Sequence, residues 1–386
     1  MVFRAIAAMA FVPLLAAQTR QSGLTVHEWG TFTSVADEAG DAVRWVSLRP
    51  PADLPCFVYH LNSMCVKCNQ ARVRMETPVL YFYSAQPATA SVYVKLPSGV
   101  ISEWYPQASR TWPAKGQTTY GNEGAIAWDR VEIAPGAPEI FPVTDETSHY
   151  YAARETDAAP LRAGAEAEKL LFYRGIADFE VPLHPRFRVD GKLELSNGGE
   201  LIQFAIVFEN RGGKAGYRLL RDLAGTVALD PPALTSAEQP VQEELAAALR
   251  AGGLYEKEAA AMIATWRDSW FEEGMRIFYV VPRKEVDRVL PLRIEPTPAA
   301  IERVFVGRME VLSPAMRETI ATAMAAGDTA TLQRFGRFAR PFCDQILHQP
   351  GKIRVAAEAA RFLARAEPAS PPLCRSETAP PVTDQK

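Results

Sequence analysis

The sequence predicts a β-rich α+β protein, in which two antiparallel β-sandwich-like domains precede a mixed α+β C-terminal region. Short strand-like segments, separated by Pro and Gly, recur through the first 230 residues or so. Amphipathic helix patterns are concentrated after residue 235. The 30 Pro residues outnumber the 24 Gly residues, which favours short strands and turns in at least part of the chain.

Composition excludes several classes of protein. The chain has 386 residues, of which 48% are hydrophobic and 23% are charged, so collagen-like, coiled-coil and wholly disordered proteins are excluded. The 42 Lys and Arg residues nearly balance the 45 Asp and Glu residues. The net charge of −3 gives no basic footprint, and we therefore expect no nucleic-acid partner.

The N-terminus resembles an export signal. Residues 1–17 contain Arg4 followed by an uncharged run from Ala5 to Ala17, which is too short to cross a bilayer as a helix. Cleavage is expected after Ala17. No later apolar stretch reaches 18 residues without a charge, so we expect no membrane span after signal cleavage and a secreted or periplasmic location.

Residues 18–143 form the first predicted β-sandwich-like domain. Met75–Tyr83 is apolar on both parities after Pro78, as in a strand that is buried on two faces. Ser91–Leu96 and Val100–Tyr105 flank a tight turn and are interpreted as a hairpin. Ala125–Ile133 is a further strand. Strands at this spacing are typical of a sandwich or barrel.

A connection and a second antiparallel β domain are predicted over residues 144–232. A loop rich in polar and aromatic residues comes first, and turn signals such as Asp190-Gly191 and Asn197-Gly198-Gly199 then separate strand-like segments. The predicted strands are Lys169–Arg174, Arg186–Leu195, Leu201–Glu209 and Tyr217–Arg221.

Residues 233–367 form the mixed α+β region. A capping box at Ser236 opens a helix that ends at Gly252-Gly253, and a second helix follows with an aromatic stripe. Two strands, Met275–Val281 and Arg303–Leu312, come next. Ser313 and Asp328 are expected to cap further helices, and 352–366 is a last helix. The Pro-rich tail, residues 368–386, is predicted to be disordered.

The five cysteines fall into an N-terminal group and a C-terminal pair. In an oxidising compartment, Cys343 and Cys374 are expected to form a disulfide that ties down the tail. Cys56 is expected to pair with Cys65 or Cys68, which leaves one thiol over.

A zinc site is the alternative for the N-terminal group. Cys56, His60, Cys65 and Cys68 give the spacing C-x3-H-x4-C-x2-C, which supplies four soft ligands for a tetrahedral Zn²⁺. This arrangement would resolve the odd number of cysteines. The disulfide interpretation is preferred, because an exported chain meets oxidant before it meets much zinc.

The inter-domain connection contains the densest group of chemically useful side chains. His149, Tyr150, Tyr151 and Arg154 are candidate ligand-binding residues, because clefts between domains commonly hold ligands. His149 and Glu155 are also candidates for a general base with its orienting carboxylate, or for two metal ligands. The structural alternative is a polar network that pins two sheets together.

Three further residues or pairs are candidates for chemistry. His27 and Glu28 lie on opposite faces of a predicted strand, where either could join a site built from distant segments; the alternative is an edge-strand pair. Glu76 and Glu103 could act as paired carboxylates, but nothing places them opposite each other. Trp112, in a predicted loop, could stack on a sugar ring or an aromatic ligand.

Several stretches resemble a family of uncharacterised secreted bacterial proteins. They are HEWGTFTSV from His27, RMETPVLYFYS from Arg74, EWYPQA from Glu103, SHYYAARETDA from Ser148 and TWRDSWFEEG from Thr265. The resemblance spans most of the mature chain. It implies a bacterial, exported protein and carries no reaction, cofactor or catalytic residue.

Three functions remain open from the sequence. The leading hypothesis is a secreted or periplasmic binding or envelope-associated protein for a small molecule or an extracellular polymer, with its ligand near residues 144–157. The second is a metal-assisted hydrolase of an envelope or extracellular polymer, which would use His149 and Glu155 with His27 or Glu28. The third is a purely structural protein.

Overall fold

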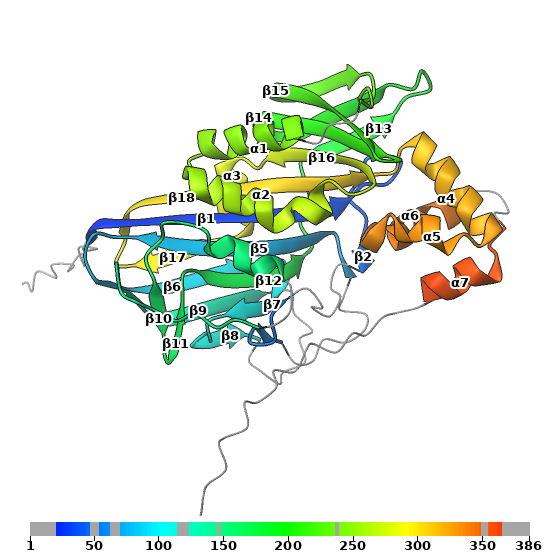
Figure 1. The fold of residues 1–386 in the computed structure, drawn as a ribbon. Coiled ribbons are helices and arrows are strands. Elements are labelled where there is room, and N and C mark those ends of the chain that lie inside the picture. The colour runs from blue at the N-terminus through cyan, green and yellow to red at the C-terminus, as the bar shows by residue number, and fades with distance from the viewer. Residues whose placement is uncertain are drawn as a thin grey trace, which may run out of the picture.

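The structure is a computed structural model of the chain. It describes residues 21–46, 54–61, 70–113, 123–144, 148–235, 239–348 and 354–364. The described part is β-rich, with helices on one face and at one end of a large sheet (Figure 1). The predicted fold class, a β-rich α+β protein, is confirmed at this level.

A ten-stranded mixed sheet forms the centre of the molecule. β1 lies in its middle, where it pairs with β18 in parallel and with β5 in antiparallel orientation. The strand order is β13 (Leu183–Phe187), β14 (Leu193–Arg211), β16 (Gly274–Val280), β18 (Pro298–Val311), β1 (Gln21–Val35), β5 (Val73–Tyr83), β12 (Leu171–Ala177), β7 (Gly99–Tyr105) and β3 (Tyr59–His60), with β15 (Lys214–Leu229) beside β14.

A six-stranded sheet packs on one face of the central sheet. Apolar side chains of both sheets, such as Val94 and Trp128 from the smaller and Val26 and Phe82 from the larger, share one hydrophobic core. The smaller sheet has the order β11 (Glu166–Glu168), β10 (Leu161–Ala163), β9 (Gly124–Ile133), β6 (Ala88–Leu96) and β17 (Leu292–Glu295), with β8 (Arg110–Trp112) beside β9. A third sheet pairs β2 (Trp45–Val46) with β4 (Gln70–Ala71).

Helices cover the opposite face and one end of the central sheet (Figure 1). On the opposite face, α1, α2 and the 3-10 helix η2 close a second hydrophobic core around Trp29, Phe208 and Trp270. The helices are η2 (His149–Arg154), α1 (Gln239–Ala251), α2 (Glu256–Trp270), α3 (Arg283–Val289), α4 (Pro314–Ala326), α5 (Thr329–Gln333), η3 (Gly336–Phe338), α6 (Ala339–Leu347) and α7 (Ala357–Ala364).

The predicted division into consecutive domains does not match the strand pairing. β1 and β5 from the predicted first domain, β12 to β15 from the second, and β16 and β18 from the C-terminal region all belong to one sheet. The boundaries at 18–143, 144–232 and 233–367 therefore do not separate independent sheets. Pairings between strands far apart in sequence, such as β1 with β18, leave no local signal in the sequence.

The predicted hairpin over residues 91–105 is wrong. β6 belongs to the six-stranded sheet, whereas β7 pairs with β12 and β3 in the central sheet. The tight turn between them therefore moves the chain from one layer of the sandwich to the other. Gly99 sits where this corner is crowded, since a Cβ there would lie 2.3 Å from the carbonyl oxygen of Ile176.

Several local predictions are confirmed. Ser313 caps α4 by accepting a hydrogen bond from the Met316 amide, and Asp328 caps α5 through Thr331. α1 ends before Gly252-Gly253, as expected. The capping box proposed at Ser236 and the tail after residue 367 lie outside the described residues.

Candidate functional site

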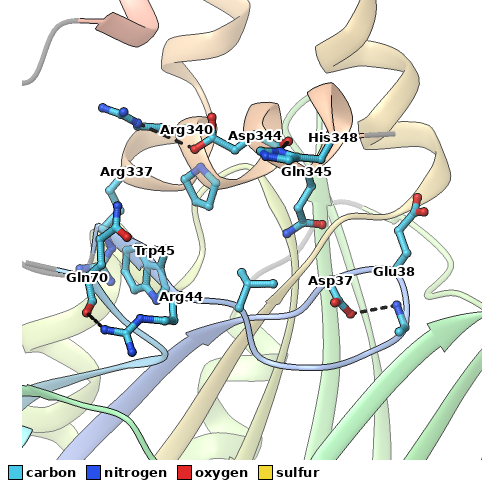
Figure 2. Close-up of a pocket in the computed structure, with 13 residues that line it drawn as sticks. Asp37, Glu38, Arg44, Trp45, Gln70, Arg337, Arg340, Asp344, Gln345 and His348 are labelled. Carbon is cyan, nitrogen blue, oxygen red and sulfur yellow. Dashed lines mark hydrogen bonds and ion pairs between the residues drawn. The ribbon is translucent and has the colours of Figure 1, made fainter. Parts of the chain in front are cut away.

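A pocket of about 600 Å³ lies where the end of β1 meets α6 (Figure 2). We call it the α6 pocket. Its lining comes from three parts of the chain, namely residues 37–45, Gln70 of β4, and residues 337–348 of η3 and α6. By contrast, a hollow of about 640 Å³ elsewhere is lined by residues 186–190 alone, at one hairpin tip.

Three arginines gather at one end of the α6 pocket (Figure 2). Arg44 donates to the carbonyl of Gln70 at 2.9 Å and forms an ion pair with Asp178 at 2.6 Å. Arg337 forms a two-pronged ion pair with a buried carboxylate, described below. These two guanidinium groups are therefore already neutralised and held in place by the protein.

Arg340, the third arginine, makes weaker contacts with the rest of the protein than Arg44 and Arg337 do. Its side chain is 41% exposed, and its ion pair with Asp344 on the next turn of α6 is long, at 3.9 Å. No hydrogen bond from Arg340 is found among the described residues. Its guanidinium is thus available to a ligand at the rim.

Gln345 reaches from α6 toward the loop side of the pocket (Figure 2). Its amide nitrogen donates to the carbonyl of Ala36 at 3.0 Å, which fixes the orientation of the amide. Its oxygen Oε1 is buried and has no hydrogen-bond partner in the described part of the chain. This oxygen has almost no accessible surface, so Gln345 shapes the pocket wall through its hydrogen bond to Ala36 and does not present an acceptor to a ligand.

Asp37 and Glu38 lie at the end opposite the arginines (Figure 2). One oxygen of Asp37 accepts from the amides of Ala39 and Asp41, both at 2.9 Å, which shapes the turn. Glu38 forms an ion pair with Arg317 of α4. Carboxylates therefore line one end of the pocket, and guanidinium groups line the other.

The wall between these ends is largely apolar. Val43, Trp45 and Pro341 contribute aliphatic and ring surface to the lining. Trp45 is held by a hydrogen bond from its indole nitrogen to the carbonyl of Arg72 at 3.3 Å and by a ring contact with Phe338 at 5.5 Å. An apolar wall with a few fixed polar groups is typical of ligand sites.

A buried charge cluster supports the arginine end of the pocket. Glu76 of β5 is fully buried and accepts from both terminal nitrogens of Arg337, the second at 3.0 Å. It also accepts from the Thr33 hydroxyl at 2.8 Å and lies 3.2 Å from Arg74. Burial alone would raise the pKa of Glu76, but the charges of Arg337 and Arg74 outweigh burial and lower this pKa to about 2.

The residues predicted around 144–157 form a structural network. Arg154 donates to Glu168 and to the carbonyl of Pro142, and its guanidinium lies over the rings of Tyr150 and Tyr151. Tyr150 is buried and donates to Glu168 at 3.0 Å. Burial and the charge of Glu168 raise the pKa of Tyr150 well above its ordinary value.

The other two catalytic candidates of that segment, His149 and Glu155, do not take part in this network. His149 is half-buried and Glu155 is exposed, and no ion pair between them is found in the described residues. η2 packs against α2, away from the α6 pocket, whose lining includes none of these residues. The segment 148–157 thus attaches η2 to the second core, and none of its candidate side chains lines a described pocket.

His27 and Glu28 point to opposite faces of β1, as the strand pattern predicted. His27 lies on the helix side, where its Nδ1 is 2.8 Å from Glu258 of α2. Glu28 lies on the sandwich side, buried with Tyr173 and Arg303. β1 is central in its sheet, so the edge-strand interpretation is wrong, and the structure does not bring the proposed hydrolase residues into one open cleft.

Among the described residues, no group of three or more His, Cys, Asp or Glu side chains is arranged so that it could hold a metal ion. Cys56 is disulfide-bonded, which removes it as a thiolate ligand. Cys65 and Cys68 lie outside the described residues. His60 lies in β3 opposite Glu103, and burial lowers the pKa of His60.

The predicted disulfide between Cys343 and Cys374 is not formed. Cys343 is a free, fully buried thiol on the inner face of α6, and Cys374 lies outside the described residues. The helix directs this side chain into the hydrophobic core. Burial raises the pKa of Cys343 to about 12.

Trp112 is the one predicted binding residue with an exposed ring, at 38% exposure in β8. It contacts Tyr93 edge-on at 5.8 Å and lies under the guanidinium of Arg110. Glu76 and Glu103 are both buried, and neither lines a described pocket.

The α6 pocket was not predicted from the sequence, because its two walls, residues 37–45 and 337–348, are far apart along the chain. The close spacing of Arg337 and Arg340 on one wall is a weak local signal for it.

Comparisons with known proteins give no family. No protein-family model matches the chain, and no curated protein matches it. Among solved structures, the chain is similar to the Fcho1 Mu homology domain of Danio rerio with bound Eps15 peptide, at a TM-score of 0.29 and 9% identity, over 77% of this chain and 99% of that one. In the described residues, no helix has the length and apolar character that crossing a membrane requires.

Proposed function

We propose that the protein is a secreted or periplasmic binding protein whose ligand occupies the α6 pocket. The observation that carries this proposal is the combination of a weakly paired guanidinium with an apolar wall in one pocket, namely Arg340 beside Val43 and Pro341. A pocket of about 600 Å³ has the size of small-molecule sites.

The proposal keeps the binding function expected from the sequence but moves the ligand away from residues 144–157. Arg154 and Tyr150 have their hydrogen-bonding groups committed to Glu168, so they have little left to offer a ligand. In the α6 pocket, by contrast, Arg340 is only weakly paired, and one oxygen of Asp37 accepts no hydrogen bond from the described residues. The hydrolase alternative receives no support from His27 and Glu28, which lie on opposite sides of the central sheet.

A thermal-shift screen tests the proposal. Purified mature protein is heated with a panel of amino acids, short peptides, hexoses, disaccharides and dicarboxylic acids. A ligand at 100 times its Kd stabilises the folded state by about 2.7 kcal/mol, so at least one class should raise the Tm. The same compounds should not raise the Tm of Ala39→Trp, because this variant places a large ring in the pocket from an exposed lining position.

Ala224→Trp is the matched control, because Ala224 is exposed on β15, away from the pocket. It should retain every shift. The proposal fails if no compound raises the Tm, or if the shifts persist unchanged in Ala39→Trp.

The exported location rests on the first 17 residues. Expression of the full chain in a bacterium should yield a periplasmic or secreted product that begins at Gln18. Intact-mass measurement of each cell fraction checks this, and a full-length product confined to the cytoplasm contradicts it.

A further inference from the structure

We infer that the α6 pocket takes a zwitterionic short peptide, with its carboxylate at the arginine end and its amino group at the Asp37 end. This inference rests on the proposed function and names the chemical class of the ligand. Its basis is the position of Arg340 and Asp37 at opposite ends of the pocket (Figure 2), with an apolar wall between them.

The arginine end selects a carboxylate. Arg44 and Arg337 each have a carboxylate of the protein in close contact, Asp178 and Glu76. Arg340 has only Asp344, at 3.9 Å. A planar guanidinium with free donors binds a carboxylate through two parallel hydrogen bonds, so Arg340 is the group that a ligand carboxylate would meet.

The middle of the pocket is apolar and suits small side chains. The methyl groups of a short alanine peptide would lie on Val43 and Pro341. A simple sugar, by contrast, has no charge for the two ends to recognise.

The acidic end selects a cation. One oxygen of Asp37 is used by the turn amides, which leaves the other for a ligand. Glu38 is paired with Arg317, so it is not the direct partner of the ligand. An α-amino group at this end would face Asp37 while the ligand carboxylate faces Arg340, so the two charges of the ligand would each meet an opposite charge.

Calorimetric titration with three probes tests the inference. The probes are trialanine, trialanine amide and N-acetyl-trialanine, each added to the mature protein at low ionic strength, where charge contacts are least screened. Trialanine should bind. Amidation and acetylation should each weaken binding about tenfold or more, because each removes one charged end.

Two variants assign the carboxylate contact. In Arg340→Gln, trialanine and its amide should bind with similar affinity, because the group that distinguishes them is gone. Arg361→Gln on α7 is the control, since Arg361 is an exposed arginine paired with Glu358 within one helix and outside the pocket. It should leave the preference for the free carboxylate unchanged.

The outcomes separate this inference from the proposed function. If all three peptides bind equally, or if none binds while another compound stabilises the protein in an Ala39→Trp-sensitive manner, the pocket binds a ligand and the peptide assignment is wrong. If neither peptides nor any other compound depends on Ala39, both the peptide assignment and the binding function are wrong.

Discussion

Arg337, in η3 just before α6, forms a two-pronged ion pair with Glu76 of β5, 261 residues earlier in the chain. The carboxylate is fully buried, and Thr33 and Arg74 contact it from the neighbouring positions of the sheet. Since Arg337 also lines the α6 pocket, this pair anchors the arginine end of the candidate site to the central sheet.

Glu76→Gln should strongly destabilise the protein. The amide keeps the shape of the side chain but removes its charge, so Arg337 and Arg74 lose their shared counter-ion in a buried place. Breaking one partner of a buried ion pair typically costs about 3–5 kcal/mol. The free energy of unfolding, measured by urea titration at pH 7, should fall by this amount.

Asp129→Asn is the control for Glu76→Gln. The Arg110–Asp129 pair has a similar distance, 2.7 Å, but its side chains are 60% and 54% exposed. Exposed pairs contribute at most about 1 kcal/mol. Equal losses in the two variants would contradict a special role for the Glu76 pair.

The same carboxylate predicts an acid limit to stability. The pKa of Glu76 is about 2 in the folded protein, below the ordinary value of 4.5, because Arg337 and Arg74 outweigh the effect of burial. A lowered folded-state pKa gives stability that is complete above pH 4.5 and is lost between pH 4.5 and 2. This group should contribute roughly 3 kcal/mol to that loss.

Urea titrations at pH 7, 4.5 and 3 measure this loss in the wild type and in Glu76→Gln. The variant should show a shallower fall over the acid range, because it has no carboxyl group to protonate at this position. Parallel curves for the two proteins would show that other carboxylates account for the acid sensitivity.

Arg154→Lys tests the structural interpretation of the 148–157 segment. Lysine keeps the charge but cannot bind Glu168 and the Pro142 carbonyl at once, nor stack its head group on Tyr151 as a planar guanidinium does. We expect a loss of about 2 kcal/mol in the free energy of unfolding. Binding in the α6 pocket should be unchanged.

Arg162→Lys is the control for Arg154→Lys. Arg162 also forms a two-pronged pair, with Glu139, but its side chain is 44% exposed, so the same exchange should have a much smaller effect. A binding defect in Arg154→Lys without a loss of stability would return the ligand site to residues 144–157.

Local features of the fold could be predicted from the sequence, whereas the partners of each strand could not. Caps at Ser313 and Asp328 and the strand at Ala125–Ile133 depend on neighbouring residues, and they are confirmed. Leu96–Gly99 has the composition of a hairpin turn but joins two sheets. A hairpin and this corner differ in strand pairing: the strand before the turn pairs with β9, and the strand after it pairs with β12.

The candidate site could not be predicted either, because it also depends on contacts between segments distant in sequence. Arg337 and Arg340 look like two of many scattered arginines until the fold brings α6 against the 37–45 segment. Conversely, Tyr150 and Arg154 gave a dense local signal because one structural network is built from a continuous stretch. The dense group of polar and aromatic residues in the sequence therefore belongs to a structural network. The α6 pocket, by contrast, forms only where segments distant in sequence pack together.

Gly307→Ala should destabilise the central sheet. Gly307 of β18 lies opposite Tyr279 of β16, and a Cβ at this glycine would be 2.1 Å from the ring carbon Cζ of Tyr279. Because the Tyr279 ring is buried, it cannot move without disturbing its neighbours. Overpacking of this kind costs about 1–3 kcal/mol, measurable by urea titration.

The matched control for Gly307→Ala is Gly198→Ala in β14, where the nearest atom to an added Cβ is 3.9 Å away. Shrinking the ring in Gly307→Ala/Tyr279→Leu should recover part of the loss. If Gly307→Ala is as stable as the wild type, the Tyr279 ring does not rest on the backbone at Gly307.

Cys343 should behave as an inaccessible thiol in the mature protein. Burial raises its pKa to about 12, so almost no thiolate forms near neutral pH, and the fully buried sulfur is shielded from reagents. Labelling with an aromatic disulfide reagent should be very slow in buffer and fast in denaturant. Peptide mapping without reduction should then find the Cys343 peptide alkylated only after unfolding, whereas recovery of that peptide joined to the one containing Cys374 would restore the disulfide that the sequence predicted.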